Sequence, residues 1–139
     1  MGFGKVTAAG IALALLLSGC AGSGFHHSRG EGNDDSRRNI YPANYKADLL
    51  AFLRAYLNDP TNIHDAVVAE PVQKSTGRGT RYVVCLKFSA RDSSGNYRGI
   101  KEYTALFLAG RFDQMTEAGK DQCAQAAYQP FPELETLTR

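Results

Sequence analysis

The spacing of apolar residues from Tyr45 to Leu57 is the clearest pattern in the chain. Apolar positions recur there every three or four residues, with polar residues between them, which places them on one side of a helix. Asn44 is a suitable N-cap, and Pro60 disfavours helical backbone before it, so the helix should end near Asn58. The predicted apolar stripe is Tyr45, Leu49, Leu50, Phe52, Leu53, Tyr56 and Leu57.

A second pattern, alternation of inward and outward positions, runs through Thr80–Ala90 and predicts a β-strand. Two further strands, Tyr97–Leu108 and Arg111–Met115, follow after short turn sequences, so we expect the three to be antiparallel neighbours. A short apolar run, Ala66–Ala69, ends at Pro71 and predicts a strand at a sheet edge. The face that should meet the helix stripe is Tyr82, Val84, Leu86 and Phe88.

These elements predict a single α+β domain over residues 40–139. One amphipathic helix should pack on an antiparallel meander sheet of three to four strands. The segment Ser75–Gly79 reads as a loop, and Cys123–Ala127 as a helical turn. Beyond it, Pro130 and Pro132 favour an extended tail.

The amino terminus has the pattern of an export signal. After Lys5, an apolar run extends from Val6 to Leu17. This run is too short for a membrane span, which needs about 20 apolar residues, and fits the apolar region of a signal peptide. Leu17-Ser18-Gly19-Cys20 resembles the lipobox of bacterial prolipoproteins. That resemblance implies cleavage after Gly19 and a lipid anchor, including a palmitate-type acyl chain, on Cys20.

The remaining amino-terminal residues are expected to link the anchor to the domain. Residues 1–19 would be removed, and residues 20–39 are poor in large apolar side chains, which is typical of a flexible tether. Ala21 follows the cysteine where some lipoproteins carry an inner-membrane retention aspartate. The resemblance therefore favours the periplasmic side of the outer membrane. An ordinary secretory signal with an incidental Cys20 is the alternative.

Two cysteines, Cys85 and Cys123, are left once Cys20 is lipidated. In an exported domain such a pair favours a disulfide, which would hold the C-terminal segment Gly119–Arg139 to the central strand. Two separate buried thiols, or one reactive or metal-binding thiol, are the alternatives. A zinc site would need further clustered ligands, which the sequence does not show at suitable spacing.

Charge is uneven, although the whole chain carries only +2. The stretch from Lys74 to Arg111 holds eight basic and two acidic residues, and both flanks are net negative. One interpretation is a surface that faces an anionic envelope component. The other is neutralisation by acidic residues elsewhere in the fold. The basic residues are Lys74, Arg78, Arg81, Lys87, Arg91, Arg98, Lys101 and Arg111.

No motif indicates catalysis, a metal or a cofactor. Gly-x-Ser-x-Gly is absent, and the lone His64 lacks a partner at motif spacing. His26, His27, Asp34 and Asp35 belong to the tether. Three acidic residues could act together only if the strands bring them close. They are Glu102, Asp92 and Asp113.

Several short motifs resemble a group of small proteobacterial lipoproteins: Asn58-Asp59-Pro60, Tyr82-Val83-Val84-Cys85 and the hairpin from Ala90 to Gly99. The resemblance implies a lipoprotein with an α+β domain and implies no activity. We therefore expect a non-enzymatic envelope protein that binds a protein or an anionic polymer and does not bind nucleic acid. An envelope enzyme whose site forms only in three dimensions is the alternative.

Overall fold

The computed structural model describes residues 2, 4, 39–77 and 79–139. The predicted signal cleavage site, Cys20 and nearly all of the predicted tether lie outside the described residues, and so does Arg78. The elements, in chain order, are α2 (Tyr45–Tyr56), β1 (Asp59–Ala69), β2 (Val72–Thr76), β3 (Gly79–Arg91), β4 (Lys101–Leu108), β5 (Arg111–Glu117), β6 (Tyr128–Pro130) and α3 (Pro132–Glu135).

The strands described form one six-stranded antiparallel sheet, ordered β5-β4-β3-β1-β6, with β2 also paired to β3. The predicted meander is present as β3, β4 and β5, so the α+β class with an antiparallel sheet is confirmed. The expected count of three to four strands is wrong. β1 and β2 lie end to end along the side of β3 that β4 leaves free.

Two local predictions are corrected by β1 and β2. The strand expected at Ala66–Ala69 begins at Asp59, and its last three residues pair with β6, so it is not a sheet edge there. Ser75 and Thr76, expected in a loop, belong to β2. The first part of β1 and all of β2 were not predicted, because β1 is irregular there and β2 has few apolar residues. Asn62 and Asp65 have φ values of 56° and 57°, which break the alternation of β1.

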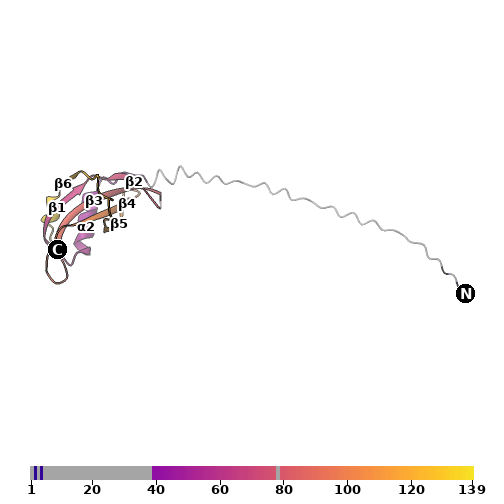
Figure 1. Cartoon of the computed structure of the whole chain (residues 1–139), viewed down its shortest axis with the longest axis horizontal. Helices are drawn as coiled ribbons and strands as arrows, with labels where there is room; N and C mark the ends of the chain where they lie inside the picture. Colours follow the sequence, from indigo (N-terminus) through magenta and orange to yellow (C-terminus); the bar gives the residue numbers. More distant parts are fainter. Residues whose placement is uncertain (1, 3, 5–38, 78) are drawn as a thin grey trace.

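The helix packs as predicted. Leu49 and Leu53 of α2 are fully buried in one cluster with Val84, Leu86 and Phe88 of β3. Figure 1 shows α2 lying against one face of the curved sheet. We call this the inner face. The stripe is narrower than expected, because Leu50, Phe52 and Leu57 are only partly buried and Tyr56 is 58% exposed.

The C-terminal tail contributes to the same core, contrary to the expected extended segment. Phe131, Leu134 and Leu137 are buried in the main cluster. The Phe131 N–H donates to the carbonyl of Ala66 in β1 at 2.8 Å, and α3 follows directly. Pro132 occupies the first turn of α3, where a missing N–H costs nothing.

Candidate functional site

The opposite, outer face of the sheet carries a disulfide between Cys85 and Cys123, which confirms the predicted pairing. The two Cα atoms lie 5.9 Å apart, within the range that a disulfide requires. Cys85 points to the outer face because the neighbouring residues of β3, Val84 and Leu86, point inward. Both cysteines are buried in a small cluster with Ala69, separate from the main core.

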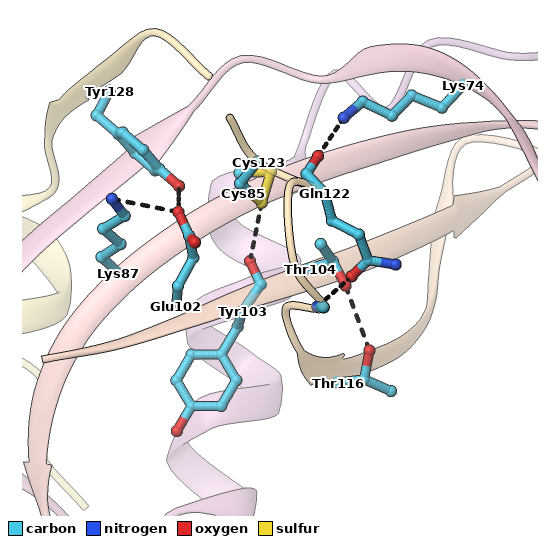
Figure 2. The surroundings of a disulfide bond; sticks show 11 residues. Lys74, Cys85, Lys87, Glu102, Tyr103, Thr104, Thr116, Gln122, Cys123 and Tyr128 are labelled. Atoms are coloured by element: carbon cyan, nitrogen blue, oxygen red, sulfur yellow. Dashed lines mark hydrogen bonds and ion pairs between the residues drawn. A yellow bond between two sulfur atoms is a disulfide. The ribbon is translucent and has the colours of Figure 1, made fainter. Parts of the chain in front are cut away.

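The disulfide holds residues 118–127 over the outer face (Figure 2), and hydrogen bonds hold the same segment at its first residue and near its middle. The Ala118 N–H donates to the carbonyl of Glu102 at 2.8 Å. Lys74 of β2 donates from its ammonium group to the carbonyl of Gln122. We call residues 118–127 the pinned segment.

Directly after the pinned segment, Tyr128 donates a hydrogen bond to the carboxylate of Glu102. Lys87 lies 3.2 Å from the same carboxylate, opposite it in the β3–β4 ladder, and its ammonium also sits over the Tyr128 ring. The Tyr128 hydroxyl and Lys87 hold the pKa of Glu102 below its usual range. Burial, with the adjacent carboxylate, raises the pKa of Tyr128. The three side chains thus join β3, β4 and β6 on the outer face.

Five of the eight basic residues form ion pairs within the described chain. The acidic partners come from β1, β4, β5 and the β3–β4 hairpin, so the strands supply most of the neutralising charge. Lys74 and Arg111 have no carboxylate partner in the described part of the chain, and Arg78 lies outside it. The pairs are Arg81–Asp113, Lys87–Glu102, Arg91–Asp59, Arg98–Asp92 and Lys101–Glu117.

Most of these ion pairs are at the surface. Arg98 is 70% exposed, although it lies 2.6 Å from Asp92. Its hydrogen bond is the main reason that the pKa of Asp92 is lowered. Hydrogen bonds from Thr61 are the main cause of the lowered pKa of Asp59. Exposed pairs of this kind stabilise a fold only slightly, so their main effect is to cancel the local positive charge.

The structure does not assemble the candidate catalytic groups. Asp92, Asp113 and Glu102 bond to three different basic residues. His64 is exposed on β1, with its ring centroid 5.2 Å from that of Tyr97. In the described residues no three His, Cys, Asp or Glu side chains group as metal ligands would.

Two grooves flank the pinned segment, and they were not foreseen from the sequence. One, of about 340 Å³, lies between β2 and residues 125–129. The other, of about 460 Å³, is lined mainly by polar side chains of β2, β4, β5 and the pinned segment, including Thr104 and Gln122. The signal that could have indicated them is the polarity of the outward positions of β4 and β5, which leaves this face too polar to pack tightly.

A smaller hollow of about 200 Å³ lies at the other end of β3, under the β3–β4 hairpin. Its floor includes Phe88 and Tyr103, and its rim includes Arg91, Arg98 and Lys101. All three rim residues already have acidic partners. Its volume is below the roughly 300–1,000 Å³ of typical small-molecule sites.

Comparisons with protein-family models, with curated proteins and with solved structures give no match to this chain. No helix in the part of the chain that the structure describes has the length and apolar content to cross a bilayer.

Proposed function

We propose that this protein is an exported lipoprotein, anchored through Cys20, whose domain binds a partner in the bacterial cell envelope, on the periplasmic side of the outer membrane. The observation that carries the proposal is the disulfide between Cys85 and Cys123. Structural disulfides persist in oxidising compartments, which an exported chain reaches. The disulfide and the Leu17–Cys20 motif are independent features that favour the same compartment.

Binding is favoured over catalysis by the arrangement of polar groups. His64 is exposed, and each of the three candidate carboxylates forms an ion pair with a different Arg or Lys residue. The grooves beside the pinned segment offer an open, preformed surface instead. Because most of the basic residues are neutralised within the fold, a protein partner is favoured over an anionic polymer.

The anchor is tested by cell fractionation of Cys20→Ser against the wild type. Wild-type protein should partition with the membrane, because two or more acyl chains give stable anchoring. The variant should be unprocessed or released as a soluble exported protein. Cys85→Ser is the matched control, since it removes a different cysteine and should leave anchoring intact. Wild-type protein with an unmodified Cys20 would contradict the proposal.

The partner is sought by crosslinking in the intact envelope with a photoreactive residue at Val72, in the groove beside β2. The same probe at Ser93, in the exposed turn of the β3–β4 hairpin, is the control. A partner-binding role predicts a defined crosslinked band from the groove position alone. Equal, diffuse labelling from both positions would argue against a specific partner on this face.

A further inference from the structure

The outer edge of β2 is one place where the described sheet is left open beside a groove. β1 has two strand neighbours, β3 and β6, but β2 pairs only with β3. The β1–β6 pairing ends where Ala69 meets Tyr128. β2 continues from β1 along β3. The position beside β2 that would continue β6 is not occupied by any described strand.

The ladder between β2 and β3 shows which backbone groups face this open edge. Thr76 pairs with Gly79 at the hairpin end. In a hairpin with two intervening residues the closing pair is hydrogen-bonded, and bonded and non-bonded pairs then alternate. Gln73 and Ser75 therefore direct their N–H and C=O groups away from β3. These are the groups with which an added strand pairs.

The groove of about 340 Å³ runs along this edge. Val72, Gln73 and Lys74 of β2 form one wall, residues 125–127 form the other, and Cys85 contributes to the floor. Val72 is 47% exposed there. The second wall is the end of the pinned segment, so the disulfide fixes the width of the groove.

We propose that β2 and this groove bind an extended polypeptide segment of a partner protein, which adds to the sheet antiparallel to β2. The inference rests on the proposed partner-binding function and specifies its site. Two charged residues beside the groove determine which charges the bound segment should carry. Glu70 lies near one end of the groove, and Lys74 lies further along β2. The segment should carry an acidic residue before a basic one.

A second copy of the chain fits this edge less well. Two β2 strands paired antiparallel would bring Lys74 of each copy close to the other, and like charges across a ladder are destabilising. β5 is also an edge strand, but its pairing with β4 is interrupted by a bulge and it carries charged residues at both ends. Bulges and charges are the features that keep an edge from pairing.

The experiment selects binders from a pooled library of random peptides on the unlipidated mature chain, Cys20→Ser. Selected peptides should slow amide hydrogen exchange at Gln73 and Ser75, and should carry the acidic-before-basic pattern. Glu70→Lys should select peptides in which the basic residue is replaced by an acidic one. A general effect of the Glu70→Lys substitution on the fold would weaken binding but would not reverse this charge preference.

The matched variants are Gln73→Pro and Gln73→Ala. Both lose the bond from the Gln73 amide to the Tyr82 hydroxyl. Only proline removes the outward N–H, at an edge position that a folded strand tolerates. Peptide affinity should fall about tenfold or more for Gln73→Pro, a difference of about 1.4 kcal/mol, and stay near wild type for Gln73→Ala. Unchanged melting of both variants establishes that they fold.

Three results would overturn the inference: no enriched peptide, equal binding to folded Gln73→Pro, or exchange protection away from β2. Concentration-dependent dimerisation that Gln73→Pro abolishes would overturn it too, because the edge would then belong to a second copy. None of these results bears on anchoring through Cys20. Wild-type protein at the membrane with no peptide binding would leave the lipoprotein proposal standing while the groove proposal fails.

Discussion

On the inner face of β3, Val84, Leu86 and Phe88 are covered by α2 and by the tail around α3. On the outer face, Cys85 is also buried, but its cover is the pinned segment, whose only apolar residues are alanines and one cysteine. Apolar packing thus holds the cover of the inner face, whereas a disulfide holds the cover of the outer face. In a small domain a disulfide can replace part of an apolar core, and here it leaves grooves where a larger core would fill the space.

The largest effect expected from this comparison is at Phe131, a tail residue that is fully buried in the inner core. Phe131→Ala should lower the free energy of unfolding by about 3–5 kcal/mol, because a buried ring is replaced by a cavity. Chemical denaturation measures the change, with the exposed neighbour Gln129→Ala as control. A loss below about 1 kcal/mol would show that the tail is not part of the core.

Removal of the disulfide should act most strongly on the outer face. For a separation of 38 residues, the chain-entropy model gives a stabilisation on the order of 4 kcal/mol. In Cys85→Ala/Cys123→Ala, amide hydrogen exchange should accelerate in residues 118–127. The exchange of Leu134 and Leu137 should stay comparatively slow, because these residues pack on the inner face. Equal acceleration across both segments would contradict the separation of the two faces.

Leu53 of α2 allows the packing of the helix on the inner face to be tested. Leu53→Ala should cost about 2–5 kcal/mol, since its side chain is fully buried against the sheet. Ala55→Ser, at an exposed position two residues further along the helix, should change stability by no more than about 0.5 kcal/mol. If both variants melt alike, the buried side of α2 has been misassigned.

The smallest loss of stability is expected from removing the hydrogen bond between Tyr128 and Glu102 on the outer face. Tyr128→Phe keeps the ring and removes the hydroxyl that donates to Glu102, so it should cost about 1 kcal/mol near neutral pH. Folding lowers the pKa of Glu102, so its ionised form stabilises the fold above its ordinary pKa of about 4.3. That contribution is lost as the pH falls through the folded-state value.

The difference between wild type and Tyr128→Phe should therefore narrow below about pH 4. Urea denaturation at several pH values measures it. A difference that is constant across this range would show that the hydroxyl does not act through the Glu102 carboxylate.

The two faces also differ in how well the sequence predicts them. α2, β3 and the meander follow from regular apolar spacing, which depends on neighbouring residues. The tail was not predicted because Phe131, Leu134 and Leu137 are too few to give a periodic signal next to two prolines, and their burial depends on the distant β1. The disulfide followed from the count of cysteines.

The site was less predictable than the fold. The basic residues were recognisable, but their neutralisation depends on strand register, which brings Lys87 opposite Glu102. The open edge of β2 could be recognised only once the pairing of β1 with β6 was known to end at Ala69 and Tyr128. The neutralisation and the open edge both depend on pairing between residues far apart in the chain, which a local sequence pattern does not predict.

If this protein is an envelope lipoprotein, export, lipidation and disulfide formation must all occur in the same molecule. One measurement tests all three: the intact mass of wild-type protein extracted from membranes and alkylated without reduction. The expected mass corresponds to a chain that begins at Cys20, carries a diacylglyceryl group and an amide-linked acyl chain, and has no alkylated cysteine. A mass that includes Met1–Gly19 with all three cysteines alkylated would contradict the account.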